Sequence, residues 1–186
     1  MKKVYLLFTD TGTLFTKMIK LYTKKAYNHA SIAFDNQLQE VYSFGRKNPR
    51  NPFIGGFVKE DIRNAFFMNS RCAMYSFWAT EEQIQNMKKI IYEIEKEQQR
   101  YKYNLTGLIT YTFNKPSQRK NAYFCSQFVA HVLKEGAGIS FNKPVSLISP
   151  YELQCIENLN LEYEGPLYYL IYRQLNKTKA YTYKVV

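Results

Sequence analysis

The stretch AYFCSQFVAHVLKEG, residues 122–136, is the segment around which the rest of the chain can be arranged. Read as a helix, it carries four apolar residues on one face at spacings of three and four. These residues are Phe128, Val129, Val132 and Leu133. Cys125 falls in the first turn, where free backbone N–H groups and the helix dipole favour a thiolate. Cys125 is therefore either a small buried hydrophobe or an activated nucleophile.

The segments on either side of this helix predict an α+β fold with a mostly antiparallel sheet packed against helices. Strands are predicted at residues 4–8, 57–62, 73–79 and 161–173, with a hairpin that turns at residues 35–37. Helices are predicted at residues 14–25, 80–100 and 149–159, and a loop at residues 46–56. Thr80 followed by Gln83 has the pattern of a capping box.

The bulk composition predicts one packed domain over residues 1–186. Hydrophobic residues make up 46% and aromatic residues 17% of the chain, with few glycines and prolines. A chain of this length can bury a substantial core without disulfides or metals.

The formal net charge of +11 suggests attraction to an acidic partner, such as nucleic acid or an anionic membrane surface. Basic and aromatic residues gather around residues 17–25, 46–50 and 115–120. A solvated Lys-rich surface explains the same charge, and the chain has no recognisable nucleic-acid-binding motif. A non-catalytic basic binding module is therefore the alternative function, and we expect no obligatory nucleic-acid partner.

Three cysteines without a CxxC pair argue against a disulfide framework and a structural zinc site, so we expect no metal and no cofactor. Cys72 and Cys155 are expected to pack as small hydrophobes. The apolar run near the N-terminus is too short for a signal peptide, and no stretch approaches a membrane span. The default expectation is a cytoplasmic protein.

A cysteine nucleophile needs a base within hydrogen-bond reach and a third group to orient that base. The chain has two histidines. His131 lies on the Cys125 helix, about 120° round from the cysteine, so the two side chains diverge. His29 opens the first strand of the predicted hairpin and is the better candidate base.

The orienting group is expected on the neighbouring strand of the hairpin. Alternation puts Glu40 on one face of this strand and Ser43 on the other. A carboxylate beside the His29 strand could reach the imidazole, so Glu40 is the first choice. Asp35 at the hairpin turn and Ser43 remain open.

These residues resemble a known family. A His that opens a strand in NHASIAFD, a polar residue on the next strand and a later Cys that starts a helix in YFCSQFV resemble the circularly permuted papain-like enzymes. These are the YiiX/YaeF-like amidase and peptidase group, related to lecithin retinol acyltransferase-like proteins and NlpC-type hydrolases. The His-before-Cys order is the permuted one, and the resemblance covers about residues 1–135. The group commonly has a Gly-Asp pair near its first strand, where this chain has TDTGT.

The resemblance implies a permuted papain-like fold and a cysteine peptidase or amidase, with Cys125 as nucleophile, His29 as base and Glu40 as third member. The expected reaction is hydrolysis or acyl transfer through a thioacyl-enzyme. The expected substrate is a small molecule, peptide or lipid with an amide or ester bond. The N–H of Cys125 is a natural oxyanion donor.

Overall fold

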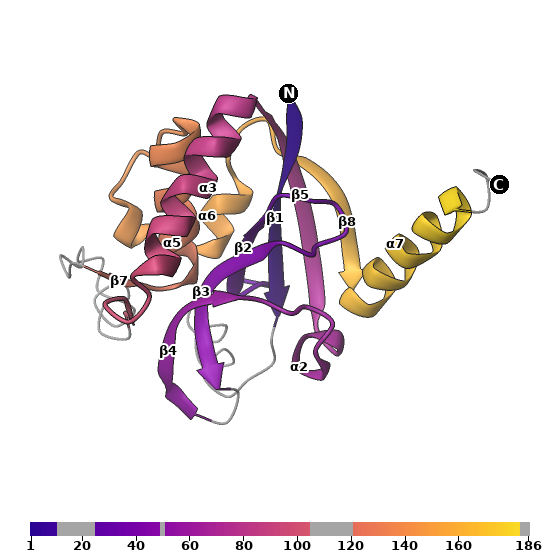
Figure 1. The fold of residues 1–186 in the computed structure, drawn as a ribbon, viewed down its shortest axis with the longest axis horizontal. Helices are drawn as coiled ribbons and strands as arrows, with labels where there is room; N and C mark the ends of the chain where they lie inside the picture. The colour runs from indigo at the N-terminus through magenta and orange to yellow at the C-terminus, as the bar shows by residue number, and fades with distance from the viewer. Residues whose placement is uncertain (11–24, 49–50, 105–120, 183–186) are drawn as a thin grey trace.

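The computed structural model describes residues 1–10, 25–48, 51–104 and 121–182. Its centre is a six-stranded antiparallel sheet in the order β4-β3-β2-β1-β5-β8 (Figure 1). The strands are β1 (Lys2–Asp10), β2 (His29–Ala33), β3 (Val41–Asn48), β4 (Asn51–Lys59), β5 (Arg71–Ala79) and β8 (Asn160–Pro166). Two further short strands, β6 (Lys102–Tyr103) and β7 (Ala122–Tyr123), pair in parallel beside this sheet. The predicted α+β class with a mostly antiparallel sheet is confirmed.

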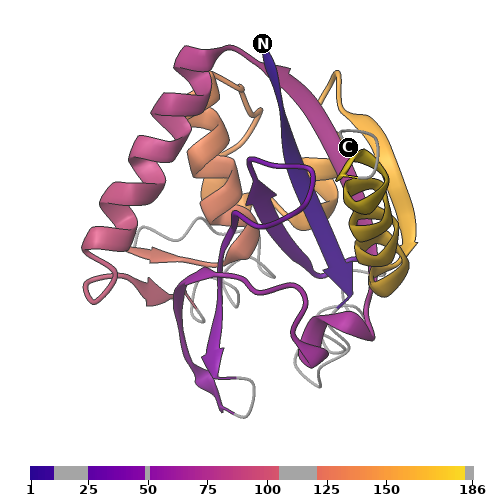
Figure 2. The same cartoon turned by 45° about the vertical axis from the view of Figure 1, so that its right-hand side comes forward.

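Helices cover both faces of the sheet. They are α2 (Ala65–Met68), α3 (Glu81–Lys96), α5 (Cys125–Ala137), α6 (Pro150–Gln154) and α7 (Leu167–Thr182), with a 3-10 turn, η1, at Val145–Leu147. Two views place α3 and α5 on one side of the sheet and α7 on the other (Figures 1 and 2). No helix in the described part of the chain is both long and apolar enough to span a bilayer.

The central strand β1 is apolar on both faces because both faces are covered. Side chains alternate along a strand, so Leu6 joins the core under α3 and α5 while Leu7 joins the core under α2 and α7. Both residues are fully buried. This double burial explains why the sequence has a continuous apolar run at this strand instead of an alternating one.

The helix α5 is fixed at both ends. At its N-terminus, the ring of Phe128 lies 5.2 Å from that of Phe44 on β3, which anchors the first turn against the sheet. At its C-terminus, Gly138 adopts the left-handed conformation with φ 72° and closes the helix. One turn earlier, Gly136 meets Met87 of α3 so closely that a Cβ atom there would lie 2.7 Å from the Met87 Cα.

The local signals for α3 and α6 are confirmed. The hydroxyl of Thr80 accepts from the Gln83 N–H and the Gln83 side chain accepts from the Thr80 N–H, which completes the capping box of α3. Ser149 caps α6 through an equivalent box with Glu152, although α6 ends earlier than predicted.

Two predicted segments are wrong. Of the loop expected at residues 46–56, residues 46–48 instead continue β3 and residues 51–56 begin β4. β4 is the edge strand of the sheet, which is where proline is usually found in sheets. The strand expected at residues 161–173 ends at Pro166, where the helix α7 begins. The predicted helix at residues 14–25 falls almost wholly outside the described residues.

Candidate active site

Cys125 is the first residue of α5, and it is only 6% exposed. Its sulfur lies 4.0 Å from the backbone oxygen of Asn28, the residue before β2. The N-terminus of α5 therefore meets the start of β2, although Cys125 and Asn28 are 97 residues apart in the chain. The backbone N–H of Cys125 is at a position where helix geometry supplies no intrahelical acceptor.

His29 opens β2 beside this cysteine, as predicted. The structure brings the two side chains within hydrogen-bonding reach of one another. Since Nε2 of His29 contacts Glu60, Nδ1 is the ring nitrogen that remains for the sulfur. The His29 side chain is 12% exposed, so the pair is shielded from bulk water.

Glu60 is the carboxylate that orients His29. Its Oε1 lies 2.6 Å from His29 Nε2, and its Oε2 accepts from the Ser31 hydroxyl at 2.5 Å. Glu60 directly follows β4, its N–H donates to the Val41 oxygen, and its side chain is 4% exposed. A buried carboxylate with a partner on each oxygen holds its position well.

Glu60 reaches His29 because β3 leaves room between them. The strand β2 pairs with β3 at Ile32 and Ala33, and the Ser43 hydroxyl then donates to the Ala30 oxygen. Gly45 on β3 has no side chain to fill the gap: a Cβ there would lie 3.6 Å from His29 Cε1 and 3.7 Å from Glu60 Oε1.

The predicted pairing of Glu40 with His29 is wrong. Glu40 Oε2 forms an ion pair with Lys88 Nζ of α3 at 2.7 Å, and the Glu40 side chain is 41% exposed. The alternative residue Asp35 is also engaged elsewhere, because it accepts from the Gln39 and Glu40 N–H groups in the hairpin turn. Ser43 is buried, but its hydroxyl is committed to Ala30.

A signal for Glu60 is present in the sequence. Alternation places Glu60 on the same strand face as Val58 and Ile62, and a carboxylate between two apolar residues indicates a buried acid. Ser31 follows His29 by two residues and so shares its face of β2. The prediction of Glu40 rests on the hairpin strands alone, whereas the true partner follows the next strand along the chain.

The electrostatics of the site favour a charged imidazole. Burial of the ring lowers the pKa of His29, but the Glu60 carboxylate and the hydrogen bond with Cys125 outweigh it and raise the pKa to about 10. His29 therefore holds its proton at neutral pH. The protonated imidazole and the N-terminus of α5 make the surroundings of the Cys125 sulfur electropositive, which is the environment typical of reactive cysteines.

The remaining cysteines and the second histidine lie elsewhere. Cys72 on β5 is fully buried, and burial raises the pKa of its thiol to about 12. Cys155 is exposed after α6, which contradicts its predicted packing as a core residue. His131 lies against the ring of Tyr123 at 5.4 Å, and burial lowers its pKa.

The side chain of Asn28 is held by Asp10 at the end of β1. Asn28 is 7% exposed, and its Nδ2 donates to Asp10 Oδ1 at 2.9 Å. This bond fixes the orientation of the amide, and Asn28 Oδ1 is buried with no hydrogen-bond partner among the described residues.

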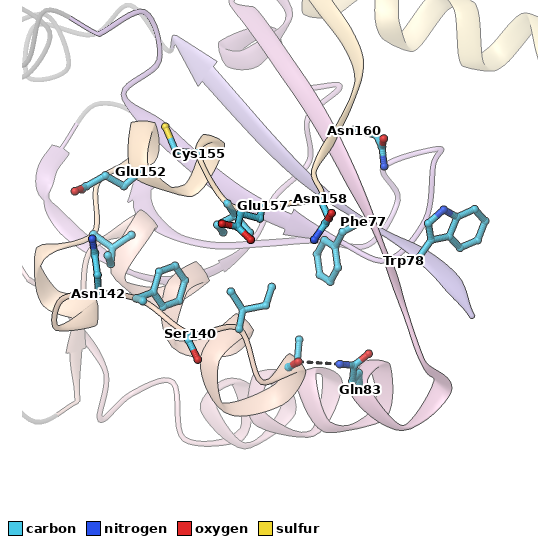
Figure 3. A pocket seen from close by; sticks show the side chains of 15 residues that line it. Phe77, Trp78, Gln83, Ser140, Asn142, Glu152, Cys155, Glu157, Asn158 and Asn160 are labelled. Atoms are coloured by element: carbon cyan, nitrogen blue, oxygen red, sulfur yellow. Dashed lines mark hydrogen bonds between the residues drawn. The ribbon is translucent and has the colours of Figure 1, made fainter.

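A separate groove of about 880 Å³ lies at the other end of α5 (Figure 3). Apolar residues such as Phe77 share its lining with the amides of Asn142, Asn158 and Asn160, and Cys155 is at its edge. It contains neither Cys125 nor His29. Within the described residues, no cluster of three or more His, Cys, Asp or Glu side chains is suited to a metal ion.

Comparison of the sequence with models of protein families finds no match, and comparison with curated proteins finds none. The functional proposal for this chain therefore rests on the geometry of Cys125, His29 and Glu60.

Proposed function

We propose that this protein is a cysteine hydrolase or acyltransferase that cleaves an amide or ester bond through a thioacyl-enzyme. Cys125 is the nucleophile, His29 the general base and acid, and Glu60 the residue that orients the imidazole. The observation that carries this proposal is the 2.6 Å contact between His29 and Glu60 beside Cys125 at a helix N-terminus. A nucleophile, a base and an orienting group in series are the requirement for this chemistry.

In the acylation step, the Cys125 thiolate attacks the substrate carbonyl carbon and forms a C–S bond. The carbonyl oxygen becomes an oxyanion, and the Cys125 N–H is positioned to donate to it. As the oxyanion collapses, the C–N or C–O bond breaks and the leaving amine or alcohol takes the proton from the His29 imidazolium.

In the deacylation step, His29 takes a proton from water or from an acceptor alcohol or amine, which attacks the thioester carbon. The C–S bond breaks and the thiolate re-forms beside the imidazolium. Glu60 keeps the imidazole in position and balances its charge through both steps. Water as acceptor gives hydrolysis, and another acceptor gives acyl transfer.

The order of the site residues along the chain supports membership of the permuted papain-like group. His29 lies on β2, which precedes the Cys125 helix in the chain, and the sheet strands β3, β4 and β5 come between them in the sequence. Glu60 replaces Glu40 as the proposed third member.

Selective alkylation tests the proposal. At about pH 6 an ordinary thiol is almost fully protonated, so a thiol held as an imidazolium–thiolate pair reacts faster with iodoacetamide than exposed Cys155 does. Peptide mass mapping measures both sites in one sample, with Cys155 as internal reference. We expect Cys125 to be labelled first and His29→Ala to reverse the order. Slower labelling of Cys125 than of Cys155 in the wild type would contradict the proposal.

Substrate screening then identifies the bond. A panel of matched amides and esters is offered to the wild type and to Cys125→Ala, and product is followed by chromatography. Turnover by the wild type that is lost in Cys125→Ala would show that the protein is an enzyme that uses Cys125. Fast alkylation without turnover on any member would instead favour a papain-like fold used for binding.

A further inference from the structure

The helix α7 has one face buried against the protein core and one face exposed to solvent. Leu167, Leu170 and Ile171 join the core on the α2 side of the sheet. On the opposite face, the exposed fractions are 43% for Tyr168, 54% for Tyr169 and 64% for Tyr172. Figure 1 shows α7 at the margin of the molecule, where it runs outward from the end of β8. Three exposed tyrosines on neighbouring turns of a peripheral helix form an aromatic surface, here called the α7 face.

The α7 segment itself carries charge of one sign. Residues 167–186 contain Arg173, Lys177, Lys179 and Lys184 and no Asp or Glu. An acid of the neighbouring strand β8, Glu162, lines the same hollow as Arg173. Arg173 is exposed beside Tyr172 and continues the α7 face. The helix α3 is also amphipathic, but its exposed face carries acids such as Glu81 and Glu82 as well as lysines. The α7 face is therefore distinguished by its tyrosines and by the lack of acids within its own helix.

We propose that the α7 face binds the surface of an anionic lipid bilayer. Tyrosine rings have an apolar body and a polar hydroxyl, which suits them to the boundary between lipid headgroups and acyl chains. The exposed Arg173 on this face and the net charge of +11 favour contact with anionic headgroups. Because the opposite side of α7 is packed on the protein core, the helix lies on the membrane and does not enter it.

A second copy of the chain fits this surface less well. Two α7 faces brought together would place like charges against each other in a protein whose net charge is already +11. The proposal is independent of catalysis by Cys125.

Vesicle sedimentation tests this inference with the full chain. The probes are phosphatidylcholine vesicles with and without about 30% phosphatidylglycerol, at about 0.1 M salt. We expect the wild type to bind the anionic vesicles only. We expect Tyr172→Ser and Arg173→Glu each to lower the partition coefficient by at least about fivefold, as loss of one interfacial anchor or charge does.

Matched controls on α3 separate the α7 face from the overall charge. Tyr92 is 63% exposed, close to the value for Tyr172, and Lys89 is an exposed cation like Arg173. We expect Tyr92→Ser and Lys89→Glu to change the partition coefficient by less than about twofold. Circular dichroism confirms that all four variants are folded.

Three results would overturn the proposal. The first is an equal fall in the partition coefficient for the α7 and α3 variants, and the second is equal binding of the wild type to neutral and anionic vesicles. The third is that the wild type binds a single-stranded oligonucleotide through α7 and does not bind vesicles. Loss confined to the α7 variants on anionic vesicles supports it.

Discussion

The imidazole of His29 is held between a carboxylate and a thiol, and its protonation state follows from that position. The Glu60 carboxylate lies 2.6 Å away and is itself buried, so removal of its charge changes the proton affinity of the ring directly. This coupling makes Glu60 the most informative residue to alter.

Glu60→Gln preserves the size of the side chain but removes its charge. We expect kcat/KM, or the rate of Cys125 alkylation at about pH 6, to fall at least about 100-fold, as for loss of an oriented acid–base group. Glu40→Gln is the matched control, since Glu40 pairs with Lys88, and we expect less than about a twofold change. Equal effects of the two variants would exclude Glu60 from the site.

The raised pKa of His29 predicts a dependence of stability on pH. Burial opposes the charge on His29, but Glu60 and Cys125 raise its pKa from 6.5 to about 10. The folded protein then holds a proton that the unfolded chain releases, so stability falls as pH rises between these values. We expect the free energy of unfolding of the wild type, relative to that of His29→Gln, to be about 5 kcal/mol larger below pH 6.5 than above pH 10.

Urea unfolding of both proteins across this pH range measures that difference. A difference that grows with pH would contradict the charged imidazole.

For single residues, the sequence alone was enough to predict that Cys125 and His29 meet, because a helix start and a strand start are local patterns. It was not enough to predict the role of Glu60. Which of several carboxylates reaches a histidine depends on how far neighbouring strands separate, and that separation is set by Gly45 and Ser43.

At the scale of secondary-structure elements, the space that β3 leaves for His29 and Glu60 determines whether the site can form. A Cβ on Gly45 would make ordinary contacts with Val58, His29 and Glu60, all at 3.5 Å or more. We expect Gly45→Ala to keep at least about half of the activity and Gly45→Leu to lose more than about 90%, because the larger side chain displaces the His29–Glu60 pair. Near-equal activity of the two variants would show that the gap at Gly45 is unimportant.

The packing of α3 on α5 predicts a stability effect away from the site. A Cβ on Gly136 would lie 2.5 Å from Met87 Cγ and 2.7 Å from its Cα, so the two helices would have to move apart. We expect Gly136→Ala to lower the free energy of unfolding by about 2 kcal/mol. Gly138→Asn is the control, because Asn accepts the left-handed conformation of this position and meets no neighbour. Urea unfolding compares the two variants.

The wrongly predicted elements have a common cause. Residues 161–173 are rich in β-forming tyrosines, but Leu167, Leu170 and Ile171 recur at helical spacing and are buried together. Tertiary burial outweighed local propensity there. At residues 51–56, turn-forming residues lie on the edge strand β4, where the sheet does not exclude them.

For the whole molecule, the site depends on contacts between distant parts of the chain. Cys125 and its neighbour Asn28 are 97 residues apart, so no local fragment can bring them together. We expect fast alkylation of Cys125 at about pH 6 to disappear in the same urea transition as the circular dichroism signal. Cys155, which is already exposed, should react at a nearly constant rate throughout. Fast labelling that outlasts the fold would contradict a site made by tertiary structure.

The order of the strands also has a consequence for synthesis. His29 and Glu60 lie on β2 and directly after β4, whereas Cys125 lies on the much later α5. During synthesis, the segments that carry His29 and Glu60 therefore leave the ribosome before the segment that carries Cys125. Under the function that we propose, a nascent chain that ends before α5 still lacks the nucleophile that forms the thioacyl-enzyme.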